Sequence, residues 1–209
     1  MAVGHNFIYT HPVNIHALSK DERQHSDSDR VSTIEYSLLG LLKDRPMHGY
    51  ELYQELCRKS GLGLIWTVRQ SQLYAILARL ESRSLVASQI VDSGPRPARK
   101  VFHLTEEGTE TLESWLPQPA GRKDFRLDFC AKLLFARAAG CASALVAAQK
   151  GECALWLAEM RSRGAACPEL SMDRLVYRYR VSQLESTAAW LDECASFVEA
   201  EKSTERGME

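Results

Sequence analysis

A seven-residue turn, D-S-G-P-R-P-A at residues 92–98, does most to limit what this chain can fold into. It separates two runs with strand character. Residues 85–91 are rich in apolar and β-branched side chains, and residues 99–104 alternate between polar and apolar. Glycine and proline favour a tight, stiff connection, so we expect a β-hairpin with Arg96 near its tip. Helical patterns surround it, which predicts a mainly α fold with one small wing.

Three helical patterns precede this hairpin and one follows it. The first opens with the capping box S-T-I-E, in which Ser32 caps free amides and the Glu35 side chain reaches back to the helix start. The last opens with Thr105 as its N-cap, followed by two acidic residues that complement the positive end of a helix. The four helices are expected at about residues 32–43, 48–59, 70–82 and 105–116.

The third helix has two contrasting faces. Leu73, Ile76 or Leu77, and Leu80 recur at helical spacing and are expected to face inward. The opposite face is short, polar or basic, and carries Ser71, Gln72, Ala75 and Arg79. Such a face suits a helix that enters the major groove of DNA. The order of helix, helix, helix, hairpin and helix is that of a winged helix-turn-helix.

Charge is unevenly distributed along the chain. The net charge is −1, which argues against indiscriminate binding to nucleic acid. Residues 66–103 nevertheless carry six arginines and lysines against two acidic residues. This local excess is typical of a surface that meets phosphates, and the alternative interpretation is a solvated surface that happens to be basic.

Enzyme, metal and membrane motifs do not occur in the sequence. It has no Gly-rich phosphate loop after a strand, no H-E-x-x-H and no G-x-S-x-G, so we expect no enzyme activity. Its six cysteines form no C-x-x-C pair, which argues against a zinc site, and no cofactor is expected. No apolar run approaches a membrane span and the first thirty residues lack a signal-peptide core, so the expected location is the cytoplasm. We expect residues 1–30, which are largely polar from Ser19 onward, to be a flexible arm.

The second half of the chain is predicted to contain three helices. The first of them carries Phe125, Phe129 and Leu133 at spacings of four. The last carries a heptad seam at spacings of 4, 3, 4, 3, 4 and 3, formed by Tyr177, Val181, Leu184, Ala188, Leu191, Ala195 and Val198. Two interpretations stay open, a helix that packs within its own domain and a helix that packs on a partner subunit. We favour the partner, because three helices with broad apolar faces are too few to bury one another.

Several motifs within residues 32–116 resemble the PadR family of transcriptional regulators. They are L-L-G-L-L at 38–42, P-M-H-G-Y-E-L at 46–52, Q-L-Y-A-I-L-A-R-L-E at 72–81, G-P-R-P-A-R-K-V-F-H-L-T-E-E-G at 94–108 and W-L at 115–116. The helical half resembles the dimerisation domain of longer members more loosely. The resemblance implies a winged helix-turn-helix at 31–120 and a helical dimerisation domain at 121–209, and the arm expected at 1–30 is longer than is typical of the family.

The resemblance also implies a function and a set of site residues. It implies a homodimer that binds a pseudo-palindromic operator in double-stranded DNA, usually as a repressor released by a small, often aromatic, effector. The alternatives are an activator, or a winged-helix module that binds protein and lacks ligand control. The residues expected at DNA are His48, Gly49, Tyr50, Arg69, Gln70, Ser71, Gln72, Tyr74, Arg79, Arg96, Arg99 and Lys100. The residues expected in the dimer are those of the heptad seam with Phe125, Phe129 and Leu133.

The chain departs from the family pattern at three places. It has V-R-Q-S-Q at 68–72 before the tyrosine of the third helix, so a different operator sequence is expected. Ser84 stands where a glycine usually ends that helix, and Phe102 stands where a tyrosine is usual. Neither change is expected to break the fold.

Overall fold

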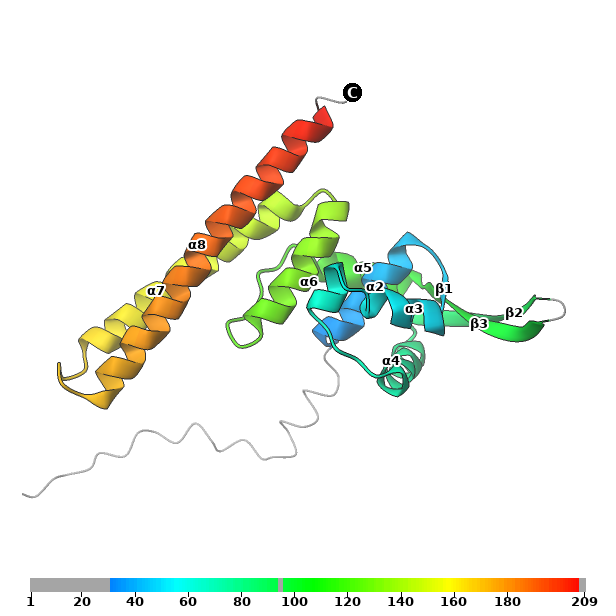
Figure 1. Ribbon diagram of the computed structural model, residues 1–209, viewed down its shortest axis with the longest axis horizontal. Coiled ribbons are helices and arrows are strands. Elements are labelled where there is room, and N and C mark those ends of the chain that lie inside the picture. Colours follow the sequence, from blue (N-terminus) through cyan, green and yellow to red (C-terminus); the bar gives the residue numbers. More distant parts are fainter. Residues whose placement is uncertain (1–30, 94–95, 207–209) are drawn as a thin grey trace, which may run out of the picture. The chain divides into compact units, whose positions relative to one another are not determined.

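The computed structural model describes residues 31–93 and 96–206, so the predicted arm at 1–30 lies outside the described residues (Figure 1). Its elements follow in the order α2 (Thr33–Asp44), β1 (Met47–His48), α3 (Gly49–Leu56), a 3₁₀ turn η1 (Gly61–Leu64), α4 (Gln70–Ser82), β2 (Val86–Ser93), β3 (Arg96–Leu104), α5 (Glu106–Trp115), α6 (Phe125–Ala138), α7 (Ala142–Ala165) and α8 (Met172–Arg206). Residues 33–209 form one compact unit, and the boundary near residue 120 stays a prediction. The mainly α fold with a winged helix is confirmed.

The small sheet has three antiparallel strands in the order β1-β3-β2. The sequence predicts β2 and β3, but both strands extend into the predicted turn, and Ser93 pairs with Arg96. The two-residue strand β1 escapes prediction because it is too short to show a period. It places Met47 opposite Phe102, so the start of α3 is fixed to the base of the wing.

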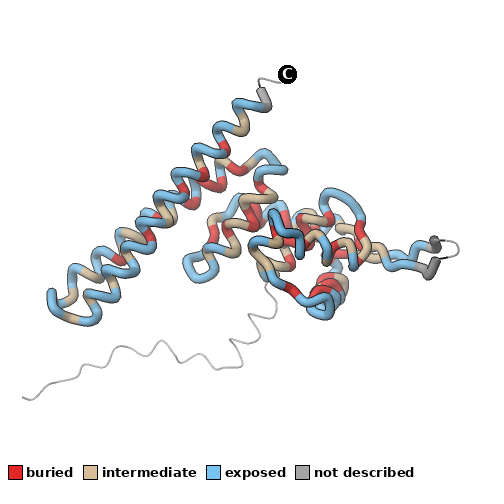
Figure 2. The backbone as a smooth tube through the Cα atoms, viewed as in Figure 1, coloured by how far each residue is buried: buried red, intermediate tan, exposed pale blue. Residues whose placement is uncertain are grey.

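A leucine core holds the winged helix together, seen as the buried segments in Figure 2. The inward row predicted for α4 is confirmed, since Leu73 and Leu80 are buried and Leu77 is the buried one of the two alternatives for the middle position. Burying one such side chain contributes about 1.5–3 kcal/mol. The largest other contributors are Leu38, Leu39, Leu52, Leu56 and Leu112. This core fixes α4 from behind and leaves its opposite face to solvent.

Local contacts set the helix ends on either side of the wing. The Thr105 hydroxyl accepts a hydrogen bond from the Gly108 amide at 3.0 Å, as expected of the N-cap of α5. Ser84, just after α4, has φ = +57°, the left-handed conformation that glycine adopts most easily. Ser84 therefore keeps the turn that the family's usual glycine would make, at some cost in backbone strain.

Helices α6, α7 and α8 share one core, and this corrects the interpretation of the heptad seam. Phe129 and Leu191 are both fully buried in it, and Val198 is 3% exposed. Tyr177 packs on Gly164 of α7, and the Cys153 thiol of α7 lies 3.7 Å from the Leu184 carbonyl oxygen. The seam is therefore filled by α7 of the same chain, which runs beside α8 in Figure 1. Heptad spacing alone does not reveal which helix fills it. None of the described helices is both long and apolar enough to cross a bilayer.

Candidate nucleic-acid interface

The first turn of α4 exposes the side chains best suited to meet DNA. Arg69, Gln70 and Ser71 are all exposed. The Gln72 amide oxygen accepts a hydrogen bond from the Arg69 backbone N–H at 3.0 Å. This cap occupies the oxygen of Gln72, so Gln70 and Ser71 have more freedom to contact bases. The first turn also adds free amides and the positive end of the helix dipole, which favour phosphate.

The H-G-Y motif at 48–50 places three residues in different environments. Gly49 is buried, and a Cβ atom on it would lie 2.5 Å from the ring of Tyr74. The missing side chain of Gly49 makes room for Tyr74, which stays 43% exposed, and a contact between Gly49 and DNA stays a prediction. Tyr50, by contrast, is 56% exposed at the start of α3. His48 is half-buried in β1, opposite Val101.

A buried carboxylate holds Arg79 from behind. The Arg79 Nε donates to a Glu35 carboxylate oxygen at 2.7 Å, and Glu35 is 1% exposed. A buried charge without a partner is strongly destabilising, so Arg79 neutralises Glu35 and ties α4 to α2. This structural role was missed, because the two residues lie 44 positions apart in sequence. A contact between Arg79 and DNA stays a prediction.

Charged side chains also organise the base of the wing. Lys100 donates to Glu81 at 2.8 Å and lies over the ring of Phe102, 5.1 Å from its centroid. This ammonium and a short hydrogen bond from Ser88 lower the pKa of Glu81. Arg99 is exposed beside this cluster. Arg96 begins β3, and its side chain lies outside the described residues.

Arg45 is a cation near the site that the sequence interpretation missed. It donates to Glu51 at 2.6 Å, and this bond lowers the pKa of the Glu51 carboxyl. Glu51 also accepts a hydrogen bond from the backbone N–H of His48, at 3.4 Å. The glutamate three residues after His48 was the available signal for this helix start. The result is an ordered α3 beside the first turn of α4.

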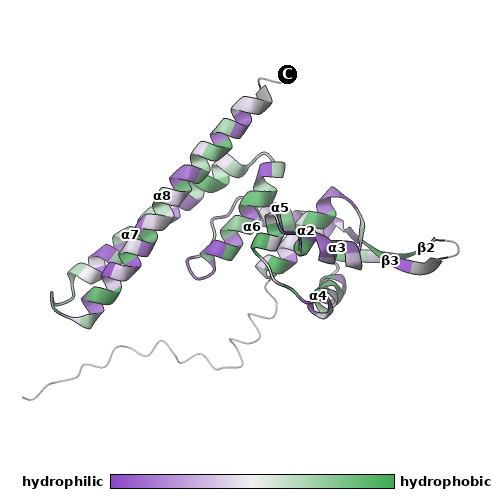
Figure 3. Ribbon diagram, in the orientation of Figure 1, coloured by the Kyte–Doolittle hydropathy of each residue, from purple (hydrophilic) through white to green (hydrophobic). Residues whose placement is uncertain are grey.

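The α7–α8 hairpin presents a surface of a different kind. Its exposed apolar side chains gather near the start of α8, where Met172 and Tyr179 are 72% and 62% exposed. We call Met172, Val176 and Tyr179, spaced four and three residues apart, the exposed α8 stripe. The hydropathy colouring shows how polar and apolar residues alternate along this helix (Figure 3). Leu155 on α7 and Leu175 on α8 are also exposed.

A pocket of about 540 Å³ lies between α6, α7 and α8. Its aromatic walls are Phe125 and Trp156, whose rings meet edge to face at 6.2 Å. Four cations line it, of which Arg122 pairs with Glu159 at 3.2 Å. The other three are Lys123, Arg126 and Arg180. Flat apolar walls with a positive rim suit a small anion that carries an aromatic ring. Among the residues described, no group of three or more His, Cys, Asp or Glu side chains is placed to hold a metal.

Comparison with known proteins identifies the winged-helix part. Residues 38–114 match the model of the Transcriptional regulator PadR-like family. The Negative transcriptional regulator PadR of Bacillus subtilis (strain 168) is 29% identical over 98 residues, which cover 45% of this chain and 53% of that protein. The chain spans about half the length of the curated relatives it matches.

Two solved structures of Bacillus subtilis PadR cover a larger share of this chain than the sequence alignment with that protein does. The crystal structure in complex with operator DNA is 24% identical with a TM-score of 0.38, and covers 80% of this chain and 99% of that one. The complex with p-coumaric acid is 24% identical with a TM-score of 0.35, over the same shares of the two chains.

Proposed function

We propose that the protein is a transcriptional repressor that binds its operator as a homodimer, because residues 38–114 match the PadR-like family model. In this proposal, the protein acts in the cytoplasm and binds promoter DNA through α4 and the wing. The single observation that carries the proposal is the first turn of α4, where Arg69, Gln70 and Ser71 stand exposed above a fixed leucine core.

DNA recognition would divide between the residues of α4 and those of the wing. Gln70 and Ser71 offer donors and acceptors to base edges in the major groove. Arg69, Arg99 and Arg96 would meet phosphates or the minor groove and set the orientation of the domain. Tyr74, seated on Gly49, would brace the start of α3 against α4.

The homodimer would form through the exposed α8 stripe and not through the heptad seam. The seam is already filled by α7 of the same chain. Met172, Val176 and Tyr179 leave apolar area in water, and a contiguous apolar patch of this kind marks a protein contact. A second copy of the chain is the partner that a two-fold symmetric operator calls for.

The effector would be an aromatic carboxylate bound in the pocket between α6, α7 and α8. The pocket supplies aromatic walls in Phe125 and Trp156, and Lys123, Arg126 and Arg180 supply positive charge at its rim. One solved relative is a complex with p-coumaric acid, an aromatic carboxylate. Replacing Arg126 and Arg180 together by glutamine should weaken such a ligand at least tenfold. Arg178→Gln on α8, outside this pocket, is the matched control.

A mobility-shift assay tests the proposed function. The full chain is mixed with DNA from upstream of its own coding region, at two salt concentrations and with excess competitor DNA. We expect a specific shift that weakens as salt rises, because bound phosphates release counterions. A folded protein that shows no specific shift here or in a selection from random DNA would favour the protein-binding module. A shift at a promoter whose transcription rises with the protein would instead indicate an activator.

A further inference from the structure

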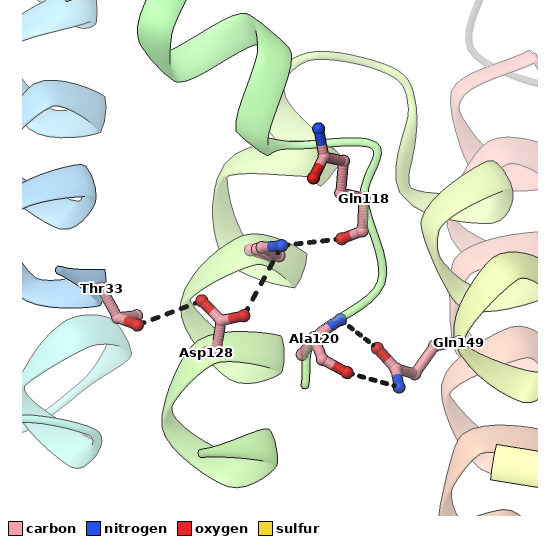
Figure 4. Close-up of polar contacts among 6 residues, drawn as sticks. Thr33, Gln118, Ala120, Asp128 and Gln149 are labelled. Atoms are coloured by element: carbon pink, nitrogen blue, oxygen red, sulfur yellow. Dashed lines mark hydrogen bonds and ion pairs between the residues drawn. The ribbon is translucent and has the colours of Figure 1, made fainter. Parts of the chain in front are cut away.

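Residues 116–120, the first part of the connection from the winged helix to α6, are fixed by two buried polar side chains (Figure 4). Lys132 Nζ donates to the Gln118 carbonyl oxygen at 2.7 Å. Gln149 makes two bonds to Ala120, accepting from its N–H at 2.6 Å and donating to its carbonyl oxygen at 3.2 Å. Lys132 is 2% exposed and Gln149 is fully buried. The sequence around these bonds, L-P-Q-P-A, also contains two prolines that restrict the backbone. This connection is therefore held rigidly and is not a free linker.

Lys132 continues this network toward the winged helix. Its ammonium lies 3.5 Å from Asp128 and 4.8 Å from the centroid of the Trp115 ring. The other oxygen of Asp128 accepts a hydrogen bond from the Thr33 hydroxyl at 3.1 Å. Thr33 is the first residue of α2, so one chain of contacts runs from α2 through α6 to the connecting segment.

Apolar contacts beside this network bring α2 and α6 close together. A Cβ atom on Gly40 of α2 would lie 2.4 Å from the ring of Phe135 on α6. Tyr36 of α2 stacks on Trp115, the last residue of α5, with 4.3 Å between ring centroids, and the Lys132 ammonium of α6 lies over the same Trp115 ring. The contact of Gly40 with Phe135 sets the distance between α2 and α6, and it does not need a charge.

Filling this space with a buried lysine is energetically unfavourable. Taking an ammonium out of water costs several kcal/mol, and an apolar side chain of similar length often packs as well or better. An apolar side chain, however, cannot orient a carboxylate, a carbonyl group and an aromatic ring around one point. Lys132 makes Asp128, the Gln118 carbonyl and the Trp115 ring converge on one point. The contacts of Lys132 thus favour a role in orientation over a role in stability.

We propose that Lys132 is a positioning residue that sets which operator spacing the protein accepts. Together with Asp128 and Thr33, it fixes the angle between the winged helix and the helices that would carry the dimer contact. A rotation of about 10° acting over a lever of roughly 20 Å, the scale of a small domain, moves a recognition helix by about 3.5 Å. That is about the rise of one base pair. This inference rests on the proposed function, since it requires a dimer that binds two half-sites.

The test measures affinity for a series of operators whose half-sites are separated by spacers that differ by one base pair. The full-length parent is compared with Lys132→Met and with the milder Thr33→Val, which removes only the hydroxyl bonded to Asp128. We expect the parent to prefer one spacer at least tenfold over its neighbours, and Lys132→Met to reduce this preference to within threefold. Thr33→Val should lie between them.

Two control variants leave the network intact. Lys43→Met removes an exposed lysine that pairs with Glu113 inside the winged helix, and Thr109→Val removes a hydroxyl that bonds within α5. Both should keep the parental spacer profile. A purely structural role for Lys132 would lower the binding-competent fraction equally for every spacer, so the ratios between spacers would not move. Unchanged ratios in Lys132→Met would overturn the proposal.

A second readout needs no DNA. Fluorophores attached through bioorthogonal amino acids at Ser82 on α4 and Ala148 on α7, both exposed, report the distance between the two parts. We expect a narrow distance distribution in the parent and in Lys43→Met, and a broad or shifted one in Lys132→Met. Identical distributions would refute the positioning role even if DNA binding is confirmed. If the parent shows a narrow distance distribution but binds no specific operator, the proposed function is wrong and the positioning of the two parts by Lys132 is not.

Discussion

Helices α4 and α8 are built alike on one side and differently on the other. Each buries an aliphatic row, Leu73, Leu77 and Leu80 in α4 and Leu184, Leu191 and Val198 in α8. The exposed side of α4 begins with Arg69, Gln70 and Ser71, whereas the exposed side of α8 begins with Met172, Val176 and Tyr179. The buried rows explain why both helices are stable. The exposed rows differ in the partner they suit, a charged polymer for α4 and another protein surface for α8.

The largest expected effect concerns the buried row of α8. Leu191 is fully buried within one chain, so Leu191→Ala should lower the free energy of unfolding by about 3 kcal/mol through lost burial and the cavity it leaves. Leu170→Ala, at a fully exposed position just before α8, should change it by less than about 0.5 kcal/mol. Urea denaturation measures both. Equal effects would mean that the seam is not filled by α7.

The exposed α8 stripe should matter for assembly and not for folding. Val176→Asp combined with Tyr179→Asp should raise the dimer dissociation constant at least a hundredfold, because the interface would bury unpaired charges. Sedimentation equilibrium measures this. Ser196→Asp combined with Ser203→Asp adds the same charge to the far half of α8 and should leave the dimer intact. If the stripe variant stays dimeric, the contact lies elsewhere.

For α4, loss of a phosphate contact should weaken DNA binding moderately. Arg69→Ala should lower operator affinity about tenfold and reduce the slope of log affinity against log salt by about 1. Arg161→Ala on α7, which removes another exposed arginine, should do neither. Fluorescence anisotropy with labelled operator at several salt concentrations separates the two variants. A salt slope that Arg69→Ala leaves unchanged would remove Arg69 from the interface.

The smallest effect is expected at the end of α4. Ser84 holds φ = +57°, which costs an L-residue energy that glycine avoids, although glycine loses more backbone entropy on folding. Ser84→Gly should therefore raise the free energy of unfolding by about 0.5 kcal/mol. The turn would keep its shape, so operator affinity should stay within a factor of two. A destabilised Ser84→Gly would show that the serine makes a compensating contact.

The sequence predicts the winged helix well because its signals are local. The leucine period of α4, the Thr105 cap and the two strands on either side of the predicted turn each depend on neighbouring residues, and all three appear in the structure. The strand β1 shows no signal, since two residues cannot display a period. The strands of the hairpin extend further than predicted because pairing continues to Ser93 and Arg96.

Long-range pairings explain what the sequence could not provide. From the sequence, Arg79 is interpreted as a surface cation, but in the structure it forms an ion pair with the buried Glu35. Gly49 reads as a close approach to DNA, but the close neighbour is the ring of Tyr74. The heptad of α8 reads as a seam for a partner, but α7 fills it. In each case the residue type is interpreted correctly and its partner is not, because a single sequence does not say which distant segment packs against it.

The central claim is that the first turn of α4 reads DNA sequence, and a selection from random DNA tests it most directly. The parent, Gln70→Ala and Arg69→Ala are each used to enrich binding sites. Gln70 is the better probe than Gln72, because the Gln72 side chain also caps the helix. We predict a two-fold symmetric motif for the parent, the same motif at lower affinity for Arg69→Ala, and a motif altered at one matching position in each half-site for Gln70→Ala. A folded parent that enriches no motif, or a Gln70→Ala motif identical to the parent's, would contradict the account.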